Sequence, residues 1–214
     1  MLEKELFASG PRFVVKTHDK DGSASNIGVP VISLDPVFPS DEPLLYQTYA
    51  GTRTEEMALT GWSAEQQETF LRMQYEAQRR SYRMQFPDAE YWVIRCDEVA
   101  VGRLIVDRTP EEIHVMDIAL LPEFRAQGIG STVMEAIMNE ALQAEKTVRL
   151  HVERFNPALR WYERLGFGVV SAGPIYLEMV WRPSRPSCNS SQPASGSGPD
   201  VQDTSLGAGL CRSI

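Results

Sequence analysis

Hydrophobic and polar residues follow two different periods along the middle of this chain, and each period predicts one type of element. Short apolar or alternating stretches bounded by turn residues are typical of strands, whereas apolar residues three or four positions apart are typical of helices. The first pattern predicts strands at Val29–Leu34, Tyr91–Arg95, Val99–Asp107, Ile113–Leu121, Val148–Val152, Gly168–Val170 and Ile175–Trp181. The second predicts helices over Ser40–Tyr49, Ser63–Tyr82, Val133–Leu142 and Asn156–Leu165.

Local signals mark the ends of two of these helices. Ser63-Ala-Glu-Gln66 has the form of a capping box, in which the serine and the glutamine satisfy each other's backbone N–H groups, and Pro87 ends the same helix. Gly166 follows Leu165 and tolerates the left-handed conformation that closes many helices. The order of strands and helices indicates one α+β domain.

Composition divides the chain into three parts. Residues 28–183 are long enough to bury one core, and residues 1–27 form an extension of unknown role in which Phe13–Val15 is compatible with a short strand. Residues 184–214 contain eight Ser, four Gly, three Pro and no aromatic residue. Such a segment buries too little apolar surface to offset its ordering entropy, so a disordered tail is expected.

The charge of the chain narrows the classes of partner. Its net charge is −8 and its pI is near 5.0, which argues against nucleic acid as a partner and favours cationic substrates. The sequence lacks an apolar run long enough for a membrane helix or signal peptide, so a cytoplasmic protein without a membrane partner is expected. The three cysteines, Cys96, Cys188 and Cys211, have no spacing typical of a disulfide framework or a metal site, so no metal is expected.

A glycine-bearing loop between a predicted strand and a predicted helix is the strongest local sign of chemistry. Its sequence is Arg125-Ala-Gln-Gly-Ile-Gly-Ser131. Unpaired backbone N–H groups and the positive end of the helix dipole would bind a phosphate there, and Arg125 would add a charged contact. The alternative is a tight strand-to-helix turn without a ligand. The loop has neither the Gly-Lys-Ser/Thr of a P-loop nor the glycine pattern of a dinucleotide fingerprint.

Two motifs resemble those of the GNAT superfamily, the Gcn5-related N-acetyltransferases. Arg125-Ala-Gln-Gly-Ile-Gly130 is similar to the family's phosphate loop, and Met116–Pro122 resembles the strand before it. Asn156-Pro-Ala-Leu-Arg-Trp-Tyr-Glu-Arg-Leu-Gly-Phe167 is similar to the family's element on its last helix. The resemblance covers Val29–Trp181 and implies an α+β fold whose central mixed, mostly antiparallel sheet is flanked by about four helices.

The resemblance also implies acetyl-CoA as co-substrate. The pyrophosphate would lie on the loop amides, and the strand backbone would pair with the pantetheine arm as an added strand. An N–H group of that strand would also polarise the thioester carbonyl. The coenzyme-binding residues implied are Ile118, Ala119, Leu120, Arg125, Ala126, Gln127, Gly128, Ile129, Gly130, Ser131 and Asn156.

Three residues are candidates for proton transfer. Tyr162 resembles the family tyrosine that protonates the leaving thiolate, although its apolar neighbours also suit a packing role. The attacking amine must lose a proton, and His151 falls on the polar face of its strand where family members often place a base. His151 is otherwise one member of a surface row with Arg149 and Glu153. Asp117 is the second candidate base, and its alternative role is to hold the substrate ammonium.

The acceptor site in this superfamily lies at the first two helices and their connection. Here that stretch carries Glu55, Glu56 and Trp62, which suit a cationic amine through charge and cation–π contacts. The alternative places both glutamates on a solvated helix face and packs Trp62 on the core.

Two functions remain open from the sequence. The first is an N-acetyltransferase in which a primary amine, from a small molecule or a protein, attacks the thioester directly in a ternary complex. The second is a noncatalytic acyl-CoA-binding regulatory module. Either a monomer or a homodimer is compatible with the pattern.

Overall fold

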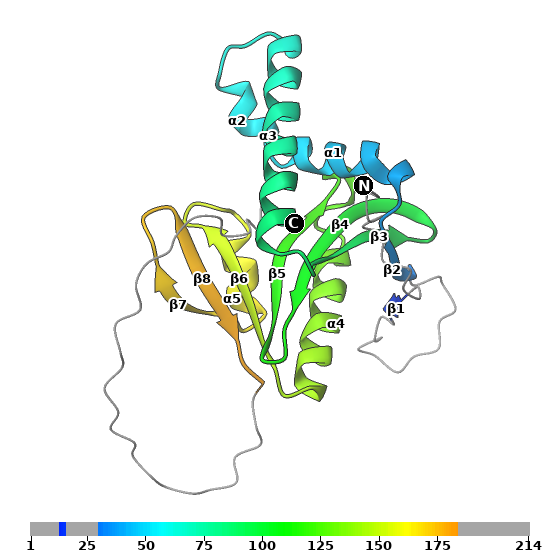
Figure 1. Ribbon diagram of the computed structural model, residues 1–214, viewed down its shortest axis with the longest axis vertical. Helices are drawn as coiled ribbons and strands as arrows, with labels where there is room; N and C mark the ends of the chain where they lie inside the picture. The colour runs from blue at the N-terminus through cyan, green and yellow to red at the C-terminus, as the bar shows by residue number, and fades with distance from the viewer. Residues whose placement is uncertain (1–12, 16–29, 184–214) are drawn as a thin grey trace, which may run out of the picture.

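The computed structural model of the protein describes residues 13–15 and 30–183 (Figure 1). The expected disordered tail, 184–214, and most of the extension 1–27 lie outside the described residues. Phe13–Val15 is the exception. It forms a strand that pairs with Ile32–Leu34, so part of the extension is joined to the sheet.

One eight-stranded sheet organises the described part of the chain, in the order β1-β2-β3-β4-β5-β6-β8-β7. All neighbours are antiparallel except β5 and β6, which are parallel. The strands are β1 (Phe13–Val15), β2 (Ile32–Pro36), β3 (Glu90–Cys96), β4 (Val99–Arg108), β5 (Glu112–Leu120), β6 (Thr147–Glu153), β7 (Gly168–Ala172) and β8 (Tyr176–Trp181). This is the mixed, mostly antiparallel α+β sheet that the sequence predicted.

Helices cover both faces of the sheet. They are α1 (Glu42–Gly51), α2 (Thr54–Ala58), α3 (Ala64–Gln85), α4 (Ile129–Gln143) and α5 (Leu159–Arg164), with short 3-10 turns at Pro39–Asp41 and Pro122–Phe124. Figure 1 shows α1 and α3 in front of the sheet and α4 behind it. The predicted capping box opens α3, since Ser63 Oγ accepts from the Gln66 N–H and Gln66 Oε1 accepts from the Ser63 N–H. Helix α2 lies between the first two predicted helices and was not predicted.

The core is divided by the sheet. On one face, apolar residues of α4 and α5 pack on alternate residues of the strands, including Leu104, Ile118 and Leu150, which are fully buried. On the other face, α1 and α3 pack around Val93, and Tyr82 packs against Ile105 and Met116. The polar residues of the central strands therefore lie on the face covered by α1 and α3.

Strands β5 and β6 diverge halfway along their length. Their pairing begins at Glu112 and Thr147 and ends with Val115 opposite Leu150, although β5 continues to Leu120 and β6 to Glu153. A β-bulge lies directly after that last pair, because Asp117 and Val115 oppose consecutive residues of β4 and Met116 is the extra residue. A bulge bends its strand and increases the local twist. The second half of β5 is therefore joined to β4 alone.

A glycine on β4 makes close packing against the diverging half of β5 possible. A Cβ atom at Gly102 would lie 2.5 Å from the Ala119 carbonyl oxygen and 2.6 Å from a Leu120 methyl group. We expect Gly102→Ala to lower the free energy of unfolding by about 1–3 kcal/mol, because the backbone of β5 must move. Urea unfolding measures this change. The matched control is Gly168→Ala on β7, where a Cβ atom meets nothing within 4 Å; equal stability of the two variants would contradict the close approach.

Candidate functional site

The predicted phosphate loop lies at the end of the diverging half of β5. A short turn at Pro122–Phe124 follows the strand, and Gly128 is the N-cap of α4 with a φ of 84°. Ala126 also has a positive φ, of 58°. Both residues lie in the left-handed region, which turns the backbone sharply into the helix.

The backbone N–H groups of 126–131 donate to no acceptor within the described part of the chain, and Thr132 is the first to bond, to the Gly128 carbonyl at 3.0 Å. Ala126, Gln127 and Gly128 are exposed, and nothing lies within 4 Å of a Cβ atom built at Gly128. Six N–H groups at the start of a fifteen-residue helix form an anion-binding end. The geometry therefore fits a phosphate at the place where the sequence predicts one.

Arg125 ties this loop to β5. Its Nε donates to the Leu120 carbonyl at 3.1 Å, and its Nη2 is buried without a partner in the described structure. Burial lowers the pKa of Arg125, and the carboxylates of Glu123 and Glu55 oppose that shift. The side chain that was expected to contact phosphate thus also holds the last carbonyl of the strand.

The connection between the first helices lies at the same end of the sheet. A Cβ atom at Gly51, the last residue of α1, would lie 3.3 Å from the Pro122 ring, and the Glu55 carboxylate acts electrostatically on Arg125. Glu55 and Glu56 are exposed on α2. Trp62 is 42 % exposed and meets the Phe70 ring edge to face at 5.2 Å. Of the predicted acceptor residues, the structure brings Glu55 to the loop and places Trp62 against α3.

The second motif is joined to the first by a hydrogen bond. Trp161 Nε1 of α5 donates to Ser131 Oγ of α4 at 3.0 Å. Tyr162 is fully buried, with its ring 4.6 Å from that of Trp161 and 5.8 Å from that of Phe167. Asn156 Oδ1 accepts from the Ala158 N–H at 2.8 Å, so its side chain holds the turn that opens α5.

A pair of histidines lies where β5 and β6 separate. His151 Nδ1 is 3.3 Å from His114 Nε2, and His114 is only 7 % exposed. Burial, reinforced by His151 and Arg149, lowers the pKa of His114 to about 4. Burial also lowers the pKa of His151, with Glu178 and Glu112 opposing the shift and Arg149 adding to it. Both imidazoles are therefore neutral at pH 7, which is the state that a base requires.

Sequence reasoning missed His114. The signal was present, because His114 lies on the predicted strand next to that of His151, and parallel pairing sets His114 opposite Arg149. Only the register reveals the contact.

Asp117 lies in a different environment. It is 1 % exposed, and its carboxylate is bonded to the guanidinium of Arg103, whose Nη1 donates to the Leu45 carbonyl of α1 at 3.2 Å. A carboxylate bonded to a buried guanidinium is a weak base, because protonation would leave the arginine charge unpaired.

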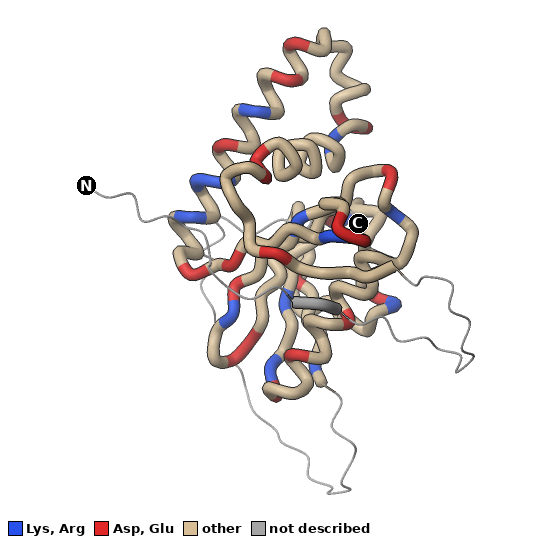
Figure 2. The backbone as a smooth tube through the Cα atoms, turned by 90° about the vertical axis from the view of Figure 1, so that its right-hand side faces the viewer, with Lys and Arg blue, Asp and Glu red and all other residues tan. Residues whose placement is uncertain are grey.

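No group of three or more His, Cys, Asp or Glu residues suited to a metal ion occurs among residues 13–15 and 30–183. Within the same ranges, no helix combines the length and apolar character needed to cross a membrane. Acidic and basic residues are interspersed along the described backbone in the view of Figure 2.

Comparison with known proteins agrees with this geometry. The sequence model of the acetyltransferase (GNAT) domain matches residues 87–169, which include β5, the loop, α4 and α5. This part of the chain belongs to the GNAT acetyltransferase superfamily. The family and the fold class predicted from the sequence are therefore confirmed, and the protein is a GNAT-family N-acetyltransferase.

Solved structures of acetyltransferases share the fold at low identity. The PaiA N-acetyltransferase of Thermoplasma acidophilum in complex with coenzyme A is 21 % identical with a TM-score of 0.55, covering 71 % of this chain and 98 % of that chain. An acetyltransferase of Thermus thermophilus is 20 % identical with a TM-score of 0.51, covering 71 % and 96 %. The ribosomal-protein-S18-alanine N-acetyltransferase of Escherichia coli is 18 % identical with a TM-score of 0.50, covering 75 % and 99 %. Comparison with curated protein sequences gives no match.

The buried histidine makes the stability of this GNAT protein depend on pH. His114 has a folded pKa of about 4, below its unfolded value near 6.5, so the unfolded chain takes up the proton first as the pH falls. We expect the free energy of unfolding to fall between about pH 6.5 and 4, at up to about 1.4 kcal/mol per pH unit from this residue. His114→Gln should flatten this slope in urea unfolding measured at several pH values. An equal slope in the variant would contradict the buried, neutral imidazole.

Proposed function

We propose that the protein transfers the acetyl group of acetyl-CoA to a primary amine by direct attack within a ternary complex. The observation that carries the proposal is that the half of β5 without a β6 partner leads into the loop 126–131, whose six N–H groups have no acceptor among the described residues. Acetyl-CoA supplies the thioester that the amine attacks. The residues named below bind that co-substrate or move protons.

The donor site consists mainly of backbone. The N–H groups of 126–131 bind the pyrophosphate, with Gly128 allowing its close approach. The edge of Ile118–Leu120 that lacks a β6 partner pairs with the pantetheine arm, and an N–H group there polarises the thioester carbonyl. Ser131 and Asn156 support this site indirectly, since Ser131 binds Trp161 and Asn156 holds the start of α5.

His151 is the base that we favour over Asp117. The His151 ring is neutral at pH 7 and lies where β5 and β6 separate, whereas the Asp117 carboxylate is bonded to Arg103 beneath α1. His151 takes the proton that the ammonium must lose before its nitrogen can attack. Tyr162 donates a proton to the departing thiolate.

The acceptor approaches from the connection between α1 and α3, which includes α2. Glu55 and Glu56 attract its ammonium group, and Trp62, further along the same connection, offers an exposed aromatic face. The net charge of −8 favours the same class of acceptor by long-range attraction.

Binding of acetyl-CoA tests the donor site. Gly128→Glu places a carboxylate among the N–H groups that bind phosphate, so we expect calorimetric titration to show tight binding by the wild type and at least about a hundredfold loss in the variant. Gly61→Glu is the matched control, because Gly61 also has a positive φ, of 67°, and nothing lies within 4 Å of its Cβ position. The control should bind as the wild type does. Failure of the folded wild type to bind acetyl-CoA or free CoA would overturn the proposed function.

Two substitutions separate catalysis from binding once an amine acceptor has been found by screening for release of the CoA thiol. Tyr162→Phe should lower kcat by about ten- to a thousandfold at every pH, because it removes the proton donor. His151→Gln should lower kcat most near neutral pH and recover as the pH rises, because the amine then deprotonates in solution. Both variants should bind acetyl-CoA normally. Binding without any turnover across the amine screen would instead favour the noncatalytic acyl-CoA-binding module.

A further inference from the structure

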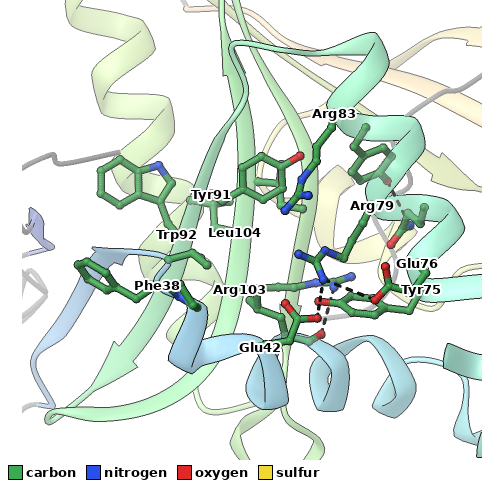
Figure 3. A pocket seen from close by; sticks show the side chains of 16 residues that line it. Phe38, Glu42, Tyr75, Glu76, Arg79, Arg83, Tyr91, Trp92, Arg103 and Leu104 are labelled. Carbon is green, nitrogen blue, oxygen red and sulfur yellow. Dashed lines mark hydrogen bonds and ion pairs between the residues drawn. The ribbon is translucent and has the colours of Figure 1, made fainter. Parts of the chain in front are cut away.

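A second cavity lies away from the donor site. It has a volume of about 370 Å³ and is enclosed by the start of α1, the second half of α3 and the strands β3 and β4 (Figure 3). No residue of the phosphate loop or of β5 or β6 lines it. Its floor is apolar and includes Val37, Leu45 and Ile105. The volume is that of a site for one small molecule.

The carboxylates that line this cavity are already occupied. Glu42 accepts from Arg79 Nη1 at 2.6 Å and also bonds to Tyr75. Glu76 lies 3.6 Å from the same Arg79. These pairs leave little negative charge for a cationic ligand.

Hydrogen-bond donors in the same cavity are not fully used. The side chain of Arg103 is 5 % exposed, and its Nε has no partner among the described residues. The hydroxyl of Tyr91 is likewise buried without a partner within those residues. Burial raises the pKa of Tyr91, and the nearby arginines, Arg83 foremost, oppose that shift, so the phenol keeps its proton at neutral pH.

Arg83 completes the set of donors. It is exposed on α3 and forms no ion pair within the described structure. Figure 3 shows Arg83 extending from α3 toward Tyr91, with Arg79 and Arg103 beside them. A buried donor without an acceptor costs about 1–3 kcal/mol, and a ligand with negatively charged oxygens would recover that cost.

We propose that this cavity binds a small carboxylate with an apolar or aromatic body. The carboxylate oxygens accept from Arg83, Tyr91 Oη and Arg103 Nε, and the body lies on the apolar floor. A carboxylate fits better than a phosphate, because Arg79 and Arg103 are neutralised by carboxylates and Arg83 alone adds uncompensated positive charge. The site differs in place and charge preference from the proposed amine acceptor site.

The cavity also connects to the donor site. Arg103 lines the cavity and bonds Asp117, which directly precedes the Ile118–Leu120 segment of β5. A carboxylate on Arg103 therefore acts next to the strand that we propose binds the pantetheine arm.

Calorimetric titration of the full-length protein with matched probes tests the site. Phenylacetate carries the proposed charge and body, whereas phenylacetamide and phenethylamine keep the ring and replace the carboxylate by a neutral or a cationic group. We expect phenylacetate to bind at millimolar or lower concentration and both matched compounds to bind at least about tenfold more weakly. Equal binding of phenylacetate and phenylacetamide, or no binding of phenylacetate at millimolar concentration, would overturn the proposal.

Two variants place the ligand in the cavity. Arg83→Gln and Tyr91→Phe should each weaken phenylacetate binding by about tenfold. Arg80→Gln is the matched control, because Arg80 is also exposed on α3 and does not line the cavity. Tyr91→Phe should leave the unliganded protein as stable as the wild type or more so, since it removes a buried hydroxyl without a partner among the described residues. Unchanged binding in both variants would place the ligand elsewhere and overturn the proposal.

Acetyl-CoA binding distinguishes this proposal from the proposed function. Arg83→Gln and Tyr91→Phe should bind acetyl-CoA as the wild type does. Loss of phenylacetate binding with retained acetyl-CoA binding supports a separate carboxylate site, whereas parallel loss of both ligands would contradict it.

Discussion

The architecture of the donor site depends on the separation of β5 from β6. Parallel strands normally pair along their common length, but here the bulge at Met116 follows the last pair, and the four residues after it, Asp117–Leu120, pair with β4 alone. The separation creates a strand edge inside the sheet, where Ile118, Ala119 and Leu120 have no β6 partner. It also aims the end of β5 at the loop that opens α4. One irregularity thus accounts for both the unpaired half of β5 and the position of the loop at its end.

Close contacts hold the unpaired half of β5 in place. Gly102 lets β4 approach the Ala119 carbonyl, Arg125 holds the Leu120 carbonyl, and the Trp161–Ser131 hydrogen bond fixes α5 against the start of α4. Each contact joins elements that are far apart in sequence. A backbone site needs such support, because its geometry depends on the positions of whole elements rather than on rotatable side chains.

The sequence predicted the helices and strands better than the side-chain contacts between them. The capping box at Ser63 and the glycine loop after Pro122 are local signals, and the structure has a helix start at both places. The contacts of His114 with His151 and of Arg103 with Asp117 depend on strand register across the sheet, which no local pattern encodes. Helix α2 has five residues, too few for a periodic pattern to appear. Asn156 was interpreted as a coenzyme contact by resemblance, whereas its observed bond to Ala158 serves the turn before α5.

The buried polar groups on the α1 and α3 face are of two kinds, a pair of histidines and an arginine–aspartate ion pair. Each kind suits a different one of the two proposed sites. The histidines at the β5–β6 divergence stay neutral because burial disfavours their charged forms, so they suit proton transfer. Arg103 is paired with Asp117 and keeps a buried Nε without a partner among the described residues, so it suits the binding of a hydrogen-bond acceptor. The two histidines lie on β5 and β6, and the bonded pair of Arg103 and Asp117 joins β4 to β5. Removal of either partner would leave the other charge buried without this ion pair, which destabilises a protein. The pair therefore stabilises the contact between β4 and β5 whether or not a ligand is bound.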